Sequence, residues 1–316
     1  MRKIFIILFS VLLVVVGGIL LGAAIVKGSL GSEDNKVEQS YDFEDAISDI
    51  TIDGNTSNIN FYKATDGKCK VICIESEKRY HEVSVNNNTL TIKEIDETKW
   101  YMQAFSFSTY KREVKIYLPN DTYNSLNIKN DTGDINIPSD FTFSNIDIAV
   151  STGDISLLAK AENDIKIKTS TGKVVLNNVE CKALSISTST GRKELTNVKA
   201  SEDIKLSSST GKTKLNSISC KNLEMDTDTG DISLVKVIAS GNITITASTG
   251  DVSFDESDGD TIKVKTSTGD VLGNILTAKS FYAHSSSGKV NVPKTTGNIC
   301  EIETSTGRIS ITITGE

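Results

Sequence analysis

Apolar and polar residues alternate in short runs along most of the chain, and the runs are paired around a glycine. One unit has Ile165 and Ile167 before Gly172, then Val174 and Leu176 after it, with mostly polar residues between them. A period of two predicts a β-strand with one buried face and one face in water. Each unit therefore predicts two strands joined at a glycine corner, where a positive φ or a close backbone contact excludes a Cβ.

The corner glycine recurs every 19 or 20 residues. This structural column consists of Gly133, Gly153, Gly172, Gly191, Gly211, Gly230, Gly250, Gly269, Gly288 and Gly307. Such a period is too short for helical-pair repeats of about 33–47 residues or for a propeller blade. One unit buries too few aliphatic side chains to offset its backbone entropy, whereas stacked units also share parallel hydrogen bonds. The repeat predicts an all-β fold, a parallel β-solenoid (β-helix) of about ten regular units of 19–20 residues, here called rungs.

Residues 45–125 carry a less regular form of the same pattern. The alternation on either side of Ser57 matches the repeat, with Ser57 in the place of the glycine. Further alternating runs follow at residues 82–85, 89–92 and 113–118, but their spacing is not constant. The sequence therefore predicts irregular N-terminal β rungs or a cap in residues 45–125 and regular solenoid repeats in residues 126–316.

Residues 4–26 are 23 consecutive uncharged residues rich in Ile, Leu and Val. At about 1.5 Å per residue, a helix of this length crosses a hydrocarbon core of about 30 Å. We predict a transmembrane anchor in residues 1–26 and a polar tether in residues 27–44, with a cleaved signal peptide as the alternative. Because Arg2 and Lys3 precede the apolar run, the positive-inside rule predicts a single-pass cell-membrane protein with a cytoplasmic N-terminus and an extracytoplasmic C-terminal domain.

Composition narrows the range of functions. The formal net charge is −7, without an excess of basic residues, which argues against a nucleic-acid partner. The only two histidines are His81 and His284, and the sequence lacks a nucleophile–base pattern, a phosphate loop and a metal-ligand spacing. We therefore expect no catalytic residue and no cofactor. A polysaccharide-acting enzyme is a less favoured alternative, because the regular rungs hold few aromatic residues on which sugars could stack.

The five cysteines fit no complete disulfide framework. Small residues stand nine positions after the corner glycine and predict a second tight corner: Cys181, Ala200, Cys220, Ala239, Gly259, Ala278 and Gly297. Cys181 and Cys220 are two rungs apart, about 10 Å, which exceeds the limit of about 7 Å for a disulfide. Cys69 and Cys73 could pair only if their strand bends sharply. We expect buried thiols that act as small apolar side chains.

The residue after each glycine belongs to a column of charges. The column reads Asp134, Asp154, Lys173, Arg192, Lys212, Asp231, Asp251, Asp270, Lys289 and Arg308. Like charges about 4.8 Å apart in water repel by about 1 kcal/mol per pair. The runs of like charge in this column therefore require an explanation. One hypothesis places a cation at Asp231, Asp251 and Asp270 and an anion at the basic block before them. The favoured interpretation is an exposed edge whose side chains diverge, without a metal.

Two features suggest protein partners. Aromatic residues gather in the irregular segment, where they form either a cap core or a partner-binding site: Trp100, Tyr101, Phe105, Phe107 and Tyr110. The last predicted strand, residues 310–314, has no evident cap and could offer an open edge to another copy of the chain. On that hypothesis, a charged substitution at Ile311 leaves the monomer folded and abolishes self-association.

Residues 114–119 (VKIYLP), 126–128 (LNI) and 130–137 (NDTGDINI), followed by serial Ser-Thr-Gly-Asp units, resemble a known family. It is the bacterial putative-adhesin family of surface β-strand-repeat proteins, mainly Gram-positive, which includes the accessory membrane protein of the Lia cell-envelope-stress operon. The resemblance implies a membrane-tethered extracytoplasmic solenoid without established catalysis or defined functional residues. We therefore expect a non-enzymatic protein that binds or senses a cell-envelope component, with a cell-surface adhesin for a protein or glycan as the alternative.

Overall fold

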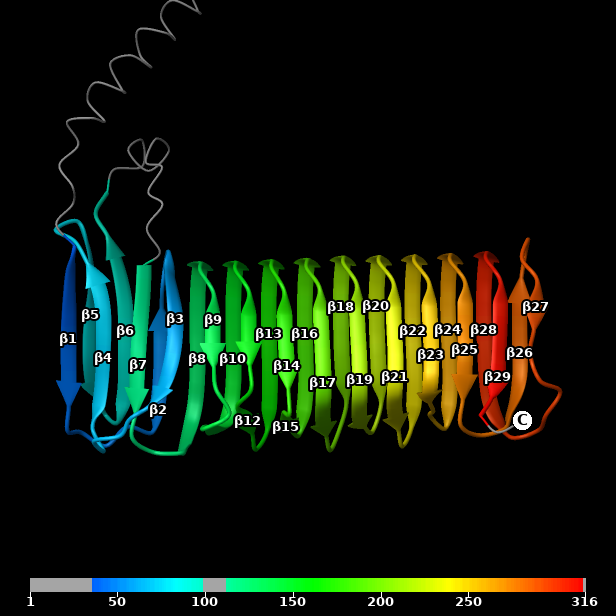
Figure 1. The fold of residues 1–316 in the computed structure, drawn as a ribbon, viewed down its shortest axis with the longest axis horizontal. Helices are drawn as coiled ribbons and strands as arrows, with labels where there is room; N and C mark the ends of the chain where they lie inside the picture. The colour runs from blue at the N-terminus through cyan, green and yellow to red at the C-terminus, as the bar shows by residue number, and fades with distance from the viewer. Residues whose placement is uncertain (1–35, 99–111, 315–316) are drawn as a thin grey trace, which may run out of the picture.

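The computed structural model describes residues 36–98 and 112–314, and throughout these residues the regular elements are β-strands. The strands form two sheets that face each other along a rod (Figure 1). In each regular rung the chain runs along one sheet, turns at the glycine and returns along the other. Successive rungs pair in parallel. The predicted all-β parallel β-solenoid is confirmed.

Each regular rung contributes one strand to the first sheet and one to the second. The first set comprises β8 (Thr122–Thr132), β10 (Thr142–Thr152), β13 (Asp164–Thr171), β16 (Ala183–Thr190), β18 (Ile204–Thr210), β20 (Leu223–Thr229), β22 (Asn242–Thr249), β24 (Thr261–Thr268), β26 (Lys279–Ser285) and β28 (Asn298–Thr306). The second set comprises β9 (Ile135–Ile137), β11 (Ile155–Leu157), β14 (Val174–Asn177), β17 (Lys193–Ala200), β19 (Thr213–Cys220), β21 (Ile232–Ala239), β23 (Val252–Ser257), β25 (Val271–Ile275), β27 (Val290–Asn291) and β29 (Ile309–Ile313). Two short strands, β12 (Lys160–Ala161) and β15 (Glu180–Cys181), extend the far end of two rungs.

The core fills the space between the sheets with columns of aliphatic side chains. Ile165 pairs with Ile146 on one neighbouring rung and with Leu184 on the other, and all three are almost fully buried. The next inward positions hold Ile167 and Thr169, which are also buried, whereas Thr171 at the corner is exposed. Side chains therefore alternate between the core and the solvent along the middle of the strand, and this alternation stops before the corner.

The corner glycines pack directly on one another. Gly153 has a φ of 152°, and a Cβ at this position would lie 2.0 Å from the carbonyl oxygen of Gly133. Gly191 is not left-handed, but its Cβ would meet the Gly172 oxygen at 2.0 Å. The corner positions thus share one requirement, which is close contact between the backbones of adjacent rungs. A side chain there would push the rungs apart.

The second corner depends on a residue that the sequence does not mark. Six positions after the glycine, five consecutive rungs have a left-handed residue: Asn178, Asn197, Ser217, Lys236 and Glu256. This residue adds a second outward position, so the inward face shifts by one residue. The expected small residues then point inward, and the first five of the seven are buried. Ala278 and Gly297 are exposed, because the chain leaves the regular repeat there.

The N-terminal end is folded out of sequence order. The rung of β2 (Asp49–Asp53) and β3 (Ser57–Lys63) lies directly on β8 and β9, and a Cβ on Gly133 would meet the Ser57 oxygen. Outside it lies the rung of β6 (Thr89–Asp96) and β7 (Arg112–Leu118). Antiparallel strands complete this end: β4 (Cys69–Glu75), β5 (Arg79–Asn86) and β1 (Val37–Phe43). Figure 1 shows this end in blue and cyan.

The C-terminal end is also out of sequence order, which corrects the expected open edge. Strand β29 pairs with β25 on one side and with β27 on the other, so residues 310–314 are internal. Ile311 is buried, and a charge there would disrupt the core of the monomer. The terminal rung is β26 with β27 (Figure 1). The rung of β28 and β29 supplies more buried aliphatic side chains, which explains why it takes the internal place.

No helix long and apolar enough to span a membrane occurs within residues 36–98 and 112–314. The predicted anchor at residues 4–26 lies outside the described residues.

Candidate functional site

The column of charges after the glycines closes the corner between rungs. The backbone N–H of Asp154 donates to Asp134 Oδ1 at 3.0 Å, and that of Lys173 donates to Asp154 Oδ1 at 2.7 Å. Each aspartate side chain thus accepts the corner N–H of the next rung. This hydrogen bond explains why aspartate recurs after the glycine.

The three aspartates proposed as a cation site have the same arrangement. Asp231 accepts from the N–H of Asp251 at 3.3 Å, Asp251 from that of Asp270 at 2.8 Å, and Asp270 from that of Arg308 at 2.7 Å. The Lys212 ammonium lies 2.8 Å from Asp231 and holds the pKa of that carboxyl below its usual range. Among the described residues, these carboxylates do not form a group of three convergent ligand atoms. The structure does not bring them together around one cation.

The basic block of the same column is paired with acids, one on the second sheet and one in the column itself. Lys173 Nζ lies 2.6 Å from a carboxylate oxygen of Glu194, and Arg192 lies 3.7 Å from the other. With Lys212 bound to Asp231, each member of the block has an acidic partner. The block is therefore not a free anion site.

The outer face of the first sheet, which contains β8, β10 and β13, carries the most distinctive charge pattern. Most of its lysines pair with an acid on the adjacent rung: Lys166 with Asp147, Lys205 with Glu224, Lys263 with Glu301 and Lys265 with Glu303. Lys129 and Lys168 are exceptions, as is Lys93 on β6, because none of them forms an ion pair with another described residue. Lys129 and Lys168 lie on either side of Ala149 in register.

A shallow hollow of about 380 Å³ lies beside these two lysines on β8, β10, β13 and β16. Small side chains create it, because Ala149 lies between two lysines and the outward positions beside it are serines. We call it the lysine–serine hollow, and its outward lining consists of Lys129, Asp131, Ala149, Ser151, Lys168, Ser170, Ser187 and Ser189. Ammonium groups and hydroxyl donors on one surface are suited to an anionic ligand.

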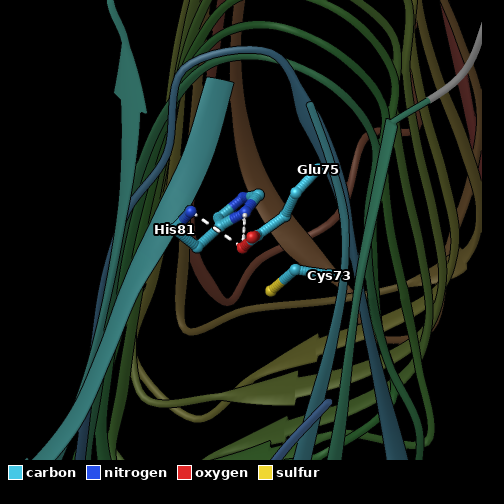
Figure 2. A group of neighbouring side chains, drawn as sticks. All are labelled: Cys73, Glu75 and His81. Carbon is cyan, nitrogen blue, oxygen red and sulfur yellow. Dashed lines mark hydrogen bonds and ion pairs between the residues drawn. The ribbon is translucent and has the colours of Figure 1, made fainter. Parts of the chain in front are cut away.

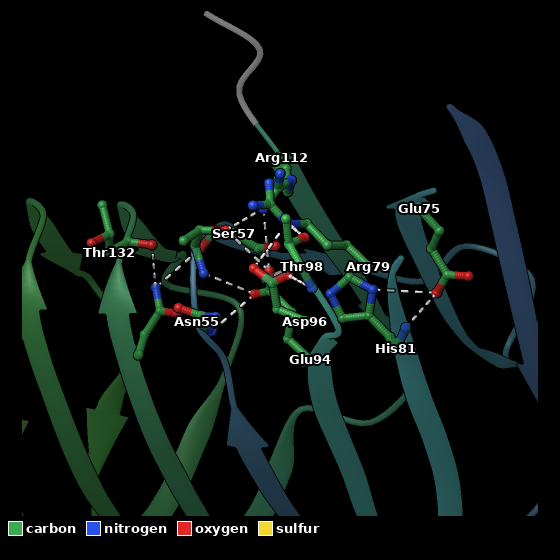
Figure 3. A network of polar contacts seen from close by, with 12 residues as sticks. Asn55, Ser57, Glu75, Arg79, His81, Glu94, Asp96, Thr98, Arg112 and Thr132 are labelled. Carbon is green, nitrogen blue, oxygen red and sulfur yellow. Dashed lines mark hydrogen bonds and ion pairs between the residues drawn. The ribbon is translucent and has the colours of Figure 1, made fainter. Parts of the chain in front are cut away.

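At the N-terminal end, Glu94 closes the corner between β2 and β3 (Figure 3). Its Oε2 accepts from the backbone N–H of Asn55 at 2.9 Å and of Thr56 at 3.0 Å. Its Oε1 accepts from the Thr56 hydroxyl at 3.1 Å and lies 3.8 Å from Arg112. The Glu94 side chain is 2% exposed. These groups satisfy one another, so this network stabilises the first rungs.

A second buried cluster at this end has the donor atoms of a metal site. Cys73, Glu75 and His81 each place one potential ligand atom within 4.8 Å of the others (Figure 2). His81 Nδ1 lies 3.2 Å from Glu75 Oε1. Burial and the nearby carboxylate of Glu75 raise the pKa of the Cys73 thiol. All five cysteines are buried and free, as expected for small apolar side chains.

The sequence analysis predicted no metal site here, because the chain has only two histidines and they are far apart in the sequence. The available sign is Cys73-x-Glu75, two residues on the same face of a strand, followed by His81 after a tight turn. The aromatic residues expected to bind a partner, Trp100, Tyr101, Phe105, Phe107 and Tyr110, lie outside the described residues.

Comparison with known proteins identifies relatives of the fold. The model of the Toastrack DUF4097 family matches residues 47–209 and again residues 199–316. No curated protein matches the chain.

Solved structures give distant likenesses. A putative adhesin from Bacteroides fragilis is 18% identical with a TM-score of 0.45, covering 77% of this chain and 97% of that chain. A putative adhesin from Parabacteroides distasonis is 12% identical with a TM-score of 0.48, covering 85% of this chain and 98% of that chain. A putative lipid binding protein from Parabacteroides distasonis is 15% identical with a TM-score of 0.46, covering 85% and 98%. These values are too low to support a functional argument.

Proposed function

The chain belongs to the Toastrack DUF4097 family, and we propose that it is a non-enzymatic, membrane-anchored protein that binds an anionic cell-envelope component outside the cytoplasm. The observation that carries this proposal is the lysine–serine hollow, with two lysines that form no ion pair within the described part of the chain, on a sheet face where most other lysines are paired.

The spacing of the hollow suits a ligand with repeated negative groups. Lys129 and Lys168 are two rungs apart in register, about 10 Å at 4.8 Å per rung. Serine hydroxyls between and beside them can donate to phosphate or carboxylate oxygens. One exposed ammonium contributes at most about 1 kcal/mol and is screened by salt. Useful affinity therefore requires several contacts along one polymer or one anionic surface.

The proposed location follows from the sequence. An uncharged stretch at residues 4–26 precedes the solenoid by a short tether, and the hollow lies on rungs near the N-terminal part of the rod. A membrane anchor would keep this surface close to the lipid headgroups and the polymers attached to them. Sensing of envelope damage, as the resemblance to the Lia accessory membrane protein implies, is the finer part of the proposal.

The test is co-sedimentation with isolated Gram-positive cell walls and, separately, with vesicles of anionic or zwitterionic lipids. A fragment of residues 31–316 retains every described strand. We expect saturable binding that weakens as salt increases, and the two arms distinguish wall polymer from lipid. The double variant Lys129→Gln/Lys168→Gln should lose most of the binding.

The matched control is Lys263→Gln/Lys265→Gln, which removes the same charge from the same sheet face but from lysines paired with glutamates. Binding by the control should remain close to that of the natural chain. Equal losses in both variants would show that the attraction depends only on net charge and would contradict a site at the hollow.

A cell-surface adhesin is the second candidate, favoured by apolar exposure at the terminal rungs. Tyr282 is 64% exposed and Ile299 is 45% exposed, on neighbouring strands of the same outer face. A protein partner could bury them. Sedimentation velocity of the fragment would detect self-association, and Tyr282→Glu should reduce it. A monomer at all concentrations would remove a second copy of the chain from consideration.

A further inference from the structure

Cys73, Glu75 and His81 converge from opposite sides of the solenoid. Cys73 and Glu75 point inward from β4 in one sheet, and His81 points inward from β5 in the other. The chain passes between the two strands in a tight turn, where Ser76 bridges to Arg79. Figure 2 shows the imidazole, the carboxylate and the thiol side by side between the strands. The three groups therefore connect the two sheets at the N-terminal end of the rod.

The donor set is that of a transition-metal site. Thiolate sulfur, imidazole nitrogen and carboxylate oxygen bind Zn²⁺ at about 2.3, 2.0–2.1 and 2.0–2.2 Å, and tetrahedral angles then separate the donors by about 3.3–3.6 Å. His81 Nδ1 and Glu75 Oε1 are already 3.2 Å apart, and all three donors lie within 4.8 Å of one another. A modest contraction would complete three coordination positions, leaving a fourth for water.

The surroundings of the cluster resemble the outer contacts of a metal site. Tyr41 on β1 donates its hydroxyl to Glu75 Oε1 at 3.0 Å, and the N–H of His81 donates to the same oxygen at 2.9 Å. Hydrogen bonds of this kind orient a ligating carboxylate. The side chain of His81 is 3% exposed, and its Nε2 has no hydrogen-bond partner among the described residues. Because Nδ1 faces Glu75, hydrogen bonding holds this imidazole at one ring nitrogen only.

Other uses of these residues fit the structure less well. Cys73 is fully buried, and a reactive cysteine needs an accessible thiolate of lowered pKa, whereas burial raises the pKa of this thiol. The neighbouring Cys69 is on the same strand four residues away, and both thiols are free. Neither a nucleophile nor a disulfide accounts for the arrangement.

We propose that Cys73, Glu75 and His81 bind one divalent transition-metal ion of the zinc type, which ties β4 to β5 and closes the N-terminal end of the solenoid. Binding replaces the thiol proton by the metal, so one proton is released from Cys73 when the thiolate–metal bond forms. Tyr41 is a positioning residue that holds the carboxylate of Glu75. The ion has a structural role and is independent of the lysine–serine hollow.

The test uses the full chain, purified in detergent with a chelator and then freed of it. Isothermal titration with Zn²⁺ should give one site. Titration with Co²⁺ should give the near-ultraviolet charge-transfer absorption of a thiolate–cobalt bond. Cys73→Ser should abolish that absorption and weaken Zn²⁺ binding at least about tenfold, and Tyr41→Phe should weaken binding about tenfold while retaining the absorption.

Cys69→Ser is the matched control, because Cys69 is buried on the same face of the same strand but lies outside the cluster. It should keep the stoichiometry, the affinity and the cobalt absorption. His81→Gln provides a second test if Cys73→Ser does not fold, as judged by circular dichroism. The proposal is overturned if the natural chain shows no thiolate–cobalt absorption, or if Cys69→Ser loses binding as strongly as the cluster variants.

Discussion

Lys193 Nζ lies 3.3 Å from the hydroxyl oxygen of Thr188, inside the solenoid, and forms no ion pair with another described residue. Lys193 occupies an inward position that Val174 and Thr213 fill on the two neighbouring rungs. Among the described residues, its one other hydrogen bond is donated to the carbonyl oxygen of Ser207 at 3.4 Å. Desolvation consequently lowers the pKa of this amine from 10.5 to about 8.

Lys193→Met should stabilise the protein at pH 7. The burial of the charged amine costs about 3 kcal/mol, and loss of its two long hydrogen bonds, to Thr188 and Ser207, costs about 1 kcal/mol together. We expect the free energy of unfolding, measured by chemical denaturation, to rise by about 2 kcal/mol. Lys199→Met is the control, because Lys199 is exposed and carries the same charge; it should change stability little.

The same substitution should change the pH dependence. Between about pH 8 and 10.5 the unfolded chain binds a proton at Lys193 that the folded chain lacks. The free energy of unfolding of the natural chain should therefore rise with pH across this window, and the penalty should be constant below it and absent above it. The variant should lack this rise. A parallel pH profile in the two proteins would show that Lys193 is not desolvated.

Gly153→Ala should be strongly destabilising. The added Cβ would lie 2.0 Å from the Gly133 oxygen, and the backbone of both residues is fixed by hydrogen bonds between rungs. We expect a loss on the order of 4 kcal/mol, with a lower melting temperature in circular dichroism. Gly67→Ala is the control that separates the steric clash from the backbone strain. Gly67 has a φ of 74°, but a Cβ there meets nothing within 4 Å. It should cost only about 1 kcal/mol.

The sequence was sufficient to predict the repeated part of the fold. The constant glycine spacing and the period of two specify the first corner, the buried columns and parallel stacking. The second corner was harder to predict from the sequence, because Lys236 and Glu256 adopt left-handed conformations that these residue types do not favour. Stacking of the neighbouring rungs imposes that conformation, and a single rung does not reveal it.

The order of the terminal rungs could not be predicted for a different reason. Inward residues of every rung are similar, so Val264 could pair equally well with Ala283 or with Ile302 on local pattern alone. Burial of the complete rung decides the order, and the better apolar set of β28 and β29 becomes internal. The metal-type cluster was hidden for a related reason: His81 meets Glu75 across the interior only because β4 and β5 belong to opposite sheets.

Asp251→Ala should be moderately destabilising, and removal of divalent cations should not. The carboxylate of Asp251 accepts the N–H of Asp270 at 2.8 Å, so alanine leaves that donor to solvent. We expect a loss of about 1–2 kcal/mol, partly restored in Asp251→Asn, whose amide oxygen can accept the same bond. Thermal unfolding of the Asp251 series with and without Ca²⁺ checks this. Stabilisation by Ca²⁺ that disappears in Asp251→Asn would instead support a cation on the aspartate column.

The order of rungs at the C-terminal end predicts which engineered cysteines form a disulfide. Lys265 on β24 pairs in register with Glu303 on β28, and Glu303 pairs with His284 on β26. Lys265→Cys/Glu303→Cys should therefore oxidise readily, because neighbouring parallel strands are about 4.8 Å apart. Lys265→Cys/His284→Cys should stay reduced, since these positions are about 10 Å apart, beyond the limit of about 7 Å for a disulfide.

All three positions lie on the outer face, and the five natural thiols are buried, so mild oxidation followed by mass analysis of non-reduced peptides reports the engineered pair. Sequence order along the rod would give the opposite result, because β26 would then lie on β24 and β28 would be terminal. Efficient crosslinking of Lys265→Cys/His284→Cys, without crosslinking of Lys265→Cys/Glu303→Cys, would therefore contradict the internal position of the last rung. It would also make Ile311 part of an exposed end, where a charged substitution is tolerated.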